Sequence, residues 1–335
     1  MEAAQSLLAE QVEAIQSGED WKRYLSFQAQ LHRYSPRNVM LICAQHAQAY
    51  QEGRLSEPDP GYVAGYNTWK ALGRSVDKGQ HGYAVLAPVR YERRTALDAD
   101  GRTRTLRRGE TAQSDETVER RQTLGGFRIE HVFALGQTSG SPVPQPPQPK
   151  LLEGEAPSGL GAAVLRLMEE RGYRVDTVPD ASSIGGANGR IDRAARTVLI
   201  RSDMDDAAMV KTLLHEAAHG LLHESPPGRY LPREVKEVEA ESVAYVVAAA
   251  HGMATDGYTF PYVAGWAGTD GAKMVLGSQD RVARAARSLI AVSPASHWPG
   301  GQVPGTDAAL AASRQRQAEA AEPLTPQATQ SAEVA

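Results

Sequence analysis

The chain has 335 residues, of which 41% are hydrophobic and 23% are charged, so it can form two domains of ordinary size with a sizeable buried core. Its single cysteine excludes a disulfide framework within the chain, and the absence of a long apolar run excludes a membrane span. The formal net charge is -4, but residues 21–108 carry 15 Lys and Arg against 7 Asp and Glu. This basic segment indicates either a polyanion partner or a solvated basic face. With no secretory signal pattern at its start, we expect a cytoplasmic protein.

The first 140 residues are expected to be mainly helical, with a small sheet. Ser35 and Pro36 form a strong helix start, because Ser accepts from helix amides and Pro suits the first turn. Between two expected strands, the charged insert at about 95–122 has no apolar periodicity and is either a hairpin arm or a mobile loop. The spacing predicts helices over 1–16, 20–34, 36–49 and 69–73, and strands over 83–93 and 127–135.

A proline-rich segment divides the chain. Five prolines fall within residues 141–149, and proline favours an extended chain that joins no sheet. After it we expect helices over 159–171, 205–224, 233–251 and 278–292, and strands over 173–178 and 197–201. The expected organisation is a first domain over 1–140, a linker over 141–157, a second domain over 158–293 and a disordered tail over 294–335.

One motif carries chemistry. His215 and His219 lie four residues apart on an expected helix, so both imidazoles share one face and can bind one metal ion. Glu216 lies between them, close enough to act as a general base on a water at the metal. The alternative is a helix with two surface histidines. A third ligand would decide between the two.

We expect Glu239 to be that third ligand. Of the acids on the next helix, Glu239 has the most apolar helical neighbours, so it is predicted to point inward. A buried carboxylate requires a metal or an arginine beside it. Two histidines and one carboxylate suit zinc best. His223, one further turn along the first helix, is expected either to lie behind the ligands or to be exposed, and the possible donors to an oxyanion are Tyr230, Tyr245, Tyr258 and Tyr262.

Two family resemblances follow from these residues. His215-Glu216-x-x-His219, followed by Glu239-Ala240-x-x-x-Ala244, resembles the ImmA/IrrE-like zinc metallopeptidases. The first domain resembles the N-terminal single-stranded-DNA-binding domain of the antirestriction protein ArdC family. That second likeness is carried by Trp21, Tyr24-Leu25, Arg33-Tyr34-Ser35-Pro36-Arg37-Asn38, Leu41-Ile42, Gln45, Ala64-Gly65-Tyr66, Trp69, Leu72-Gly73-Arg74, Lys78-Gly79, Ala87-Pro88-Val89, Phe133, Gln137-Thr138 and Gly140. The resemblance covers roughly residues 20–265.

The resemblance implies an α+β chain in which a mixed helix and small-sheet DNA-binding domain is joined to a zincin-like metallopeptidase domain. From the residues themselves, a single-strand binder combines cationic side chains with aromatic rings that stack on bases. The side chains that we expect to contact DNA are Arg33, Tyr34, Arg37, Tyr66, Arg74 and Lys78.

The predicted function is a single-stranded-DNA-binding zinc metallo-endopeptidase that cuts an unidentified protein substrate and has an antirestriction or mobile-element role. His215, His219 and Glu239 would bind Zn²⁺, with Glu216 as catalytic base. Two alternatives remain open. The chain could be a non-catalytic DNA-protecting protein with a structural zinc, or a regulatory peptidase that cuts a repressor-like protein.

Overall fold

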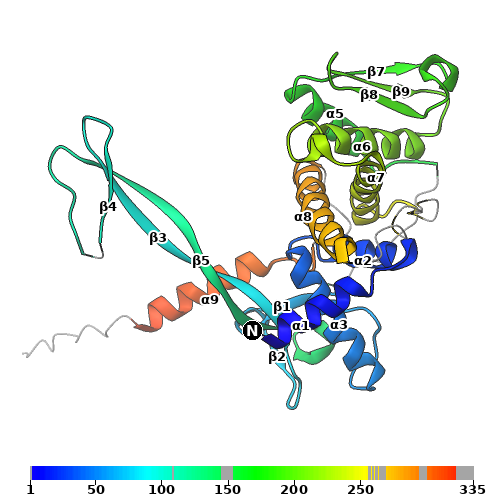
Figure 1. The fold of residues 1–335 in the computed structure, drawn as a ribbon. Helices are drawn as coiled ribbons and strands as arrows, with labels where there is room; N and C mark the ends of the chain where they lie inside the picture. Colours follow the sequence, from blue (N-terminus) through cyan, green and yellow to red (C-terminus); the bar gives the residue numbers. More distant parts are fainter. Residues whose placement is uncertain are drawn as a thin grey trace, which may run out of the picture.

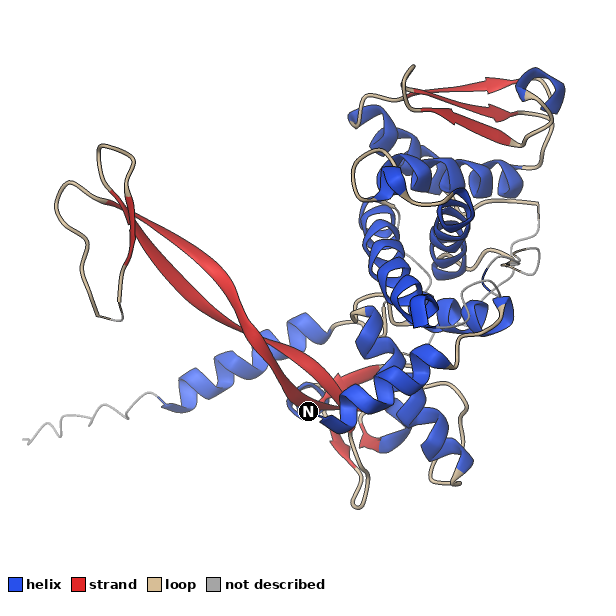
Figure 2. Ribbon diagram, in the orientation of Figure 1, coloured by secondary structure: helices blue, strands red, loops and turns tan. Residues whose placement is uncertain are grey.

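A computed structural model describes residues 2–107, 109–144, 154–255, 269–293 and 300–321, together with 258, 260 and 263 (Figure 1). The expected mixture of helices and sheets is confirmed (Figure 2). The α-helices are α1 (Glu2–Glu13), α2 (Gly18–Gln30), α3 (Pro36–Gln51), α4 (Tyr66–Ala71), α5 (Leu160–Glu170), α6 (Asp206–Leu222), α7 (Arg233–Ala250), α8 (Thr269–Val292) and α9 (Thr306–Ala321). The strands are β1 (Val63–Gly65), β2 (Arg74–Val76), β3 (Tyr83–Leu97), β4 (Thr103–Thr105), β5 (Thr117–Ala134), β6 (Thr138–Gly140), β7 (Arg174–Val178), β8 (Gly189–Asp192) and β9 (Thr197–Arg201). Short 3-10 turns are η1 (Leu135–Gln137), η2 (Ala181–Ile184) and η3 (Gly228–Tyr230).

In the N-terminal part, residues 2–144, helix α3 packs against β3 of an antiparallel sheet of order β1-β5-β3-β4, and α1 and α2 pack against α3. The expected cap of α3 is present, since Ser35 accepts from the amide of Asn38 and Pro36 begins the helix. Side-chain amides on α3 hold β3 in place. Asn38 Nδ2 donates to the carbonyl of Leu86 at 3.0 Å, and the Leu86 amide donates back to Asn38 Oδ1 at 2.8 Å.

The charged insert forms a hairpin arm. Strands β3 and β5 pair without interruption from Tyr83 opposite Val132 out to Leu97 opposite Thr117, apart from one bulge after Val89. The strand predicted over 83–93 therefore continues into the insert, and so does its partner. The paired strands extend away from the rest of the molecule (Figures 1 and 2).

The second part, residues 154–293, places a three-stranded sheet over a set of helices. Its strand order is β7-β9-β8, with β7 parallel and β8 antiparallel to β9, so β8 lies at an edge. Helix α6 packs beneath this sheet and against α7, and α7 packs in turn against α8 (Figure 1). Helix α8 begins at Thr269, earlier than the expected start at residue 278.

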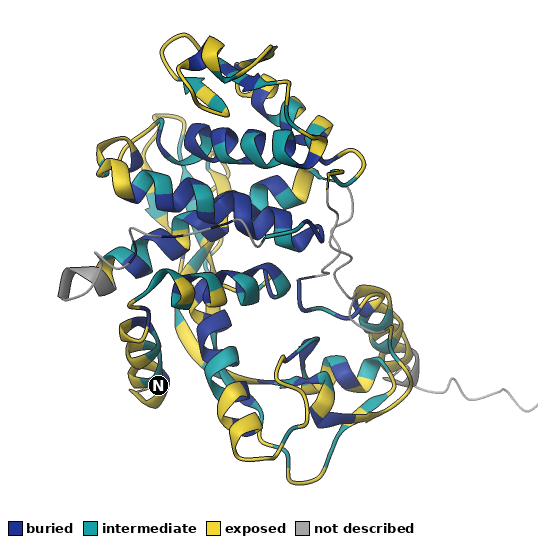
Figure 3. Cartoon of the chain, turned by 90° about the vertical axis from the view of Figure 1, so that its right-hand side faces the viewer, coloured by how far each residue is buried: buried dark blue, intermediate teal, exposed yellow. Residues whose placement is uncertain are grey.

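The two predicted domains share one hydrophobic core. Trp21 of α2 and Val246 of α7 are fully buried and belong to the same cluster, as does Leu289 of α8. The indole of Trp21 donates to Ser242 Oγ at 2.7 Å, which joins α2 to α7 by a buried hydrogen bond. Buried positions therefore run continuously from one part into the other (Figure 3). The domain limits themselves stay a prediction, and residues 145–153 of the predicted linker lie outside the described residues.

The expectation of a disordered tail from residue 294 needs correction over residues 300–321. The amide of Val63 donates to the carbonyl of Gly301 at 2.7 Å, and Val303 packs in a cluster with Tyr62 and Trp69. Helix α9 follows and contacts α4. Its many alanines have the highest helix propensity, whereas the small number of large apolar residues in the segment had suggested disorder. In the part of the chain that the structure describes, no helix combines the length and apolar character needed to cross a membrane.

Candidate metal centre and its cleft

Helix α6 carries the histidine pair. Its N-cap is Asp205, whose carboxylate accepts from the Ala208 amide at 2.7 Å. One face of the helix is buried against α7 and the sheet, and Leu214 and Ala218 are fully buried. This packing fixes the rotation of α6, so that His215 and His219 both face the first two turns of α7.

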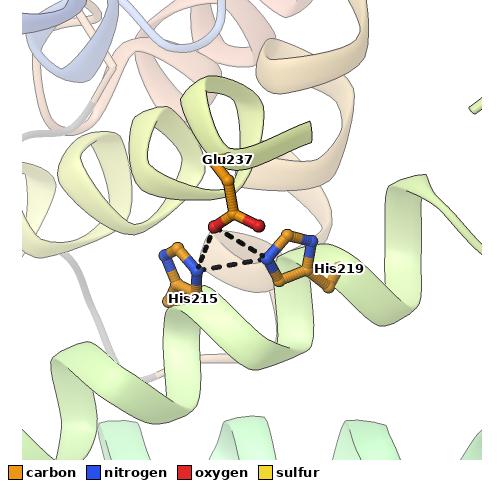
Figure 4. Close-up of side chains that lie close together, drawn as sticks. All are labelled: His215, His219 and Glu237. Atoms are coloured by element: carbon orange, nitrogen blue, oxygen red, sulfur yellow. Dashed lines mark hydrogen bonds and ion pairs between the residues drawn. The ribbon is translucent and has the colours of Figure 1, made fainter. Parts of the chain in front are cut away.

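The structure brings together His215, His219 and Glu237 (Figure 4). The two imidazole Nε2 atoms are 3.1 Å apart, and Glu237 Oε2 lies 3.5 Å from His215 Nε2 and 3.6 Å from His219 Nε2. A tetrahedral ion with bonds of about 2.0–2.1 Å would require its ligands to be roughly 3.3 Å apart. The three donor atoms therefore already stand at the spacing of a metal site that leaves one position open.

The second nitrogen of each histidine also has a partner. His215 Nδ1 lies 3.1 Å from Glu241 Oε2, and His219 Nδ1 lies 3.0 Å from His223 Nδ1. Histidines that bind metals usually donate their other N–H to a carboxylate or similar acceptor, which fixes the tautomer and leaves the far nitrogen for the ion. With the Nδ1 atoms engaged in this way, Nε2 of both residues is left facing Glu237, where a metal ion could bind.

Glu239 does not reach the histidine pair. It is buried, as predicted, but its Oε2 lies 3.1 Å from His223 Nε2, while Oε1 accepts from Ser278 Oγ at 2.7 Å and from Arg281 Nε at 2.8 Å. The cation that compensates its burial is thus Arg281 of α8, the arginine alternative to a metal. Glu237 has mostly polar helical neighbours, so the apolar pattern that favours Glu239 does not select it. Those neighbours are polar because that face of α7 borders an open cleft.

The electrostatics of the three ligands are coupled. Burial alone would lower the pKa of His215, but Glu237 and Glu241 outweigh it and raise the pKa to about 10. Burial lowers the pKa of His219. The two histidines in turn hold the pKa of Glu237 well below its usual range. The carboxylates that favour a proton on His215 favour a divalent cation in its place, so metal binding must release that proton.

Glu216 stands beside the pair as the expected base. It is buried, and burial raises the pKa of its carboxyl, opposed by the charge of His215. A carboxylate with a raised pKa accepts a proton more readily near neutral pH than an ordinary glutamate does. Its position in the cleft therefore suits the role predicted for it.

Strand β8 passes very close to this base at Gly189. A methyl group built at Gly189 would lie 2.6 Å from Thr212 Cγ2 and 3.0 Å from Glu216 Cγ, so only glycine allows this approach. An Asn-Gly pair such as Asn188-Gly189 is typical of a turn. Nothing local in the sequence indicates that this glycine faces α6, because the contact depends on how β8 packs over that helix.

An open cleft of about 830 Å³ surrounds these groups, between β8 and helices α6 and α7. Tyr258 also lines it, is buried, and has a hydroxyl with no hydrogen-bond partner among the described residues. Of the other tyrosines considered as oxyanion donors, Tyr230 is exposed, Tyr245 is buried and Tyr262 lies outside the described residues. The cationic side chains on the cleft wall are Arg190, Arg193, Lys211, Arg233 and Lys236.

The predicted DNA contacts fall into two groups. Arg33, Arg37, Tyr66 and Lys78 are exposed on the N-terminal part, although Arg33 also contacts Gln302. These four positions stay predictions. Their side chains lie on the surface, where a nucleic acid could reach them.

The other two predicted contacts are engaged within the fold. The hydroxyl of Tyr34 donates to the carbonyl of Val63 at 2.8 Å, and burial raises its pKa to about 12. Arg74 donates from Nε to Thr138 Oγ1 at 2.9 Å and from Nη1 to the Ser141 carbonyl at 2.6 Å, so it fastens β2 to the segment around β6. The structure gives both residues a structural role.

The N-terminal part of the chain matches a known family model. Residues 1–133 match the family model described as the N-terminal domain of anti-restriction factor ArdC. An uncharacterized protein of Bacillus anthracis is 25% identical over 267 residues, which cover 75% of this chain and 43% of that protein. The chain therefore spans less than half the length of this curated relative.

Two solved structures are also similar. The metal-free antirestriction ArdC protein from the R388 plasmid is 20% identical, with a TM-score of 0.45, over 76% of this chain and 84% of that one. The Mn(II)-bound structure of the same protein is 18% identical, with a TM-score of 0.42, over 76% and 87% of the two chains.

Proposed function

We propose that this chain is a zinc-dependent endopeptidase whose N-terminal part binds single-stranded DNA, in an antirestriction role. The observation that carries the peptidase is the convergence of His215, His219 and Glu237 beside Glu216 in an open cleft. The DNA-binding half of the proposal is supported by the family match over residues 1–133.

The donor set favours a catalytic metal over a structural one. Structural zinc sites are closed by four protein ligands, whereas catalytic sites use three and keep one position open. Glu241 is the obvious fourth candidate, but its carboxylate is turned to the far nitrogen of His215. Two imidazoles and one carboxylate, with a cleft beside them, match the catalytic pattern.

When bound, zinc would lower the pKa of a water and polarise the scissile carbonyl. Glu216 would take a proton from the attacking water as the new carbon–oxygen bond forms, and would give the proton to the leaving amine as the carbon–nitrogen bond breaks. Tyr258 is the proposed donor to the carbonyl oxygen as negative charge develops there. Strand β8, at the edge of its sheet, lies along the same cleft.

The cleft wall indicates the kind of peptide that fits. Lys211 and Arg193 are among five cationic residues that line it. An acidic segment would neutralise them, so we propose that acidic peptides are cleaved with higher kcat/KM than basic ones of equal length. Lys211→Glu and Arg193→Glu should each lower the ratio of kcat/KM for acidic peptides to that for basic peptides. A ratio that neither charge reversal changes would contradict this proposed preference.

The first experiment measures metal content and proteolysis together. Wild type and the matched control Glu234→Ala, an exposed acid on α7, should bind one zinc per chain, and Glu237→Ala should lose it. Glu216→Gln should keep the metal and lose cleavage. Each protein is assayed with and without single-stranded DNA.

The outcomes separate the candidate functions. Cleavage that needs Glu216 and Glu237 supports the peptidase. Zinc without cleavage under any DNA condition would leave the DNA-protecting protein, which the N-terminal family match favours independently. Cleavage of a repressor-like partner at full rate without DNA binding would support the regulatory peptidase. An absence of bound metal in wild type would overturn the proposed centre.

A further inference from the structure

The hairpin arm has a section with almost no core of its own. We define the shaft as residues 88–95 of β3 and 119–127 of β5, which pair with each other beyond the body of the protein (Figure 1). Most of its side chains are exposed, whereas Tyr83 and Val132 at its base are buried. Most side chains on the shaft therefore do not pack in a core and are accessible to a partner.

Large apolar side chains gather on this exposed ribbon. Tyr91 is 52% exposed, Leu124 54% and Phe127 48%. They surround the bulge at Gly125, and a methyl group built there would lie 3.0 Å from the ring of Tyr91, so that ring lies over the glycine. Leu124 is opposite Arg90 and Phe127 is opposite Pro88, so both lie on the other face of the ribbon from Tyr91. Single exposed apolar residues are ordinary, but exposed aromatic rings on a projecting arm indicate a contact surface.

The shaft also places like charges opposite each other. Arg93 pairs with Arg121 and Arg94 with Arg120 in the β3–β5 register. Like charges directly opposite destabilise a sheet, and a bound anion would remove that cost. The shaft contains five arginines and two glutamates, so its net charge is positive.

Side-chain alternation brings the charge and the aromatic ring together. Arg93 and Arg121 lie on the same face because they are directly opposite, and Tyr91, two residues before Arg93, shares that face. Arg121 forms an exposed ion pair with Glu119, at 3.2 Å, and Arg93 Nη2 donates to Thr105 Oγ1 at 3.0 Å. Contacts of this exposed kind exchange readily for a phosphate.

We propose that this face of the shaft, formed by Tyr91, Arg93 and Arg121, binds a single strand of DNA, with Tyr91 stacking on a base and the two arginines contacting backbone phosphates. The proposal rests on the proposed DNA-binding function and adds a surface separate from α3, α4 and β2, where the predicted contacts lie. A single strand is the fitting partner because its unpaired bases offer their faces to an aromatic ring, whereas bases in a duplex are stacked on each other.

The test uses the full chain and a fluorescently labelled oligothymidine, with binding followed by anisotropy over a range of salt concentrations. Arg93→Gln with Arg121→Gln should weaken binding and lower the slope of log affinity against log salt by roughly 1.4, for two lost phosphate contacts on a single strand. The matched control removes the same charge with Arg102→Gln and Arg174→Gln, which are exposed and lie off this face. This control variant should keep most of the affinity, and its salt slope should stay closer to the wild-type slope than that of the shaft variant does.

Stacking has its own test. Tyr91→Ala should weaken binding roughly tenfold to a hundredfold, and Tyr91→Phe should retain it, because phenylalanine keeps the ring. Tyr230→Ala removes another exposed tyrosine, from η3, and should leave binding unchanged. All these positions are exposed, so thermal unfolding of each variant should match wild type.

The outcomes distinguish this surface from DNA binding in general. If the shaft variants bind like wild type while Arg37→Gln with Lys78→Gln binds weakly, the proposed surface is wrong and DNA binding by the chain stands. If wild type binds no oligothymidine at all, both proposals fall. Equal competition by duplex DNA would overturn the stacking contact. If the shaft variants differ from wild type in sedimentation mass but not in DNA affinity, the partner that binds the shaft is instead a second copy of the chain.

Discussion

His223 Nε2 lies 3.1 Å from Glu239 Oε2, and both side chains are fully buried. On its other side, His223 Nδ1 lies 3.0 Å from Nδ1 of His219. If His219 donates to His223, then His223 must donate to Glu239, so all three groups are satisfied without an extra proton. A line of contacts thus runs from the candidate ligand His219 through His223 and Glu239 to Arg281 on α8.

This line predicts that His223 positions His219 for the metal. His223→Leu removes the acceptor and should lower zinc affinity by roughly 10- to 100-fold. His223→Gln can still accept at one end and donate at the other, so it should restore much of the affinity. The affinity is measured by competition with a chelator of known strength. Equal weakening by both variants would show that His223 only fills space.

Arg281 should be needed for stability because it compensates a buried carboxylate. Arg281→Met leaves Glu239 charged and buried, which should lower the free energy of unfolding by about 3–5 kcal/mol. Adding Glu239→Gln removes the charge and should recover much of that loss. Arg284→Met, on the exposed side of the same helix, is the control and should change little. Urea denaturation measures all four proteins, and a double variant no more stable than the single one would contradict the explanation.

Gly189 should be required for the position of Glu216, the proposed base. Gly189→Ala places a methyl group against Thr212 and Glu216, so we expect a fall in kcat with zinc still bound. Thr212→Ser removes the nearest methyl and keeps the hydroxyl that donates to Ala208. The double variant should therefore regain part of the activity. Unchanged kcat in Gly189→Ala would mean that β8 moves without disturbing Glu216.

Acid should destabilise the N-terminal part through His46. Burial lowers its pKa, and its ring contacts the Tyr83 hydroxyl at 2.8 Å and the Glu57 carbonyl at 3.0 Å. The unfolded chain, with a histidine pKa of about 6.5, then binds more protons than the folded one as pH falls. The stability contributed by neutral His46 is present above pH 6.5 and is lost as pH falls from there towards the lower folded pKa.

The measurement compares unfolding of wild type and His46→Gln between pH 7.5 and pH 5.5. The wild type should lose more stability over this range than the variant does. His81→Gln, at an exposed histidine, should follow the wild-type profile. Parallel profiles for wild type and His46→Gln would show that other groups cause the acid sensitivity.

Local patterns predicted the features that local geometry determines. The spacing of His215 and His219 is sufficient to put them on one helical face, and Ser35-Pro36 is sufficient to begin α3. The choice between Glu237 and Glu239 depends on how α7 is rotated against α6. It also depends on Arg281, which is 42 residues from Glu239. No window of sequence contains that information, and the inward position of Glu239 is explained by an ion pair with Arg281 instead of a metal.

The same limit explains the two segments that were harder to predict. The insert at 95–122 has no apolar alternation because most of its own side chains are exposed, so the usual sign of a strand is absent. Residues 300–303 contain only one large apolar side chain, Val303. Its partners Tyr62 and Trp69 lie more than two hundred residues earlier.

The return of Val303 to Tyr62 and Trp69 makes the N-terminal part discontinuous in the chain. The polypeptide leaves this part after β6, forms the helices and sheet that carry the metal centre, and comes back to complete it. During synthesis the ribosome must therefore make the whole second part before Val303 can cover those two aromatic rings. A fragment that stops at residue 140 keeps the rings and lacks their cover, so the two parts of this chain should be expressed together rather than dissected.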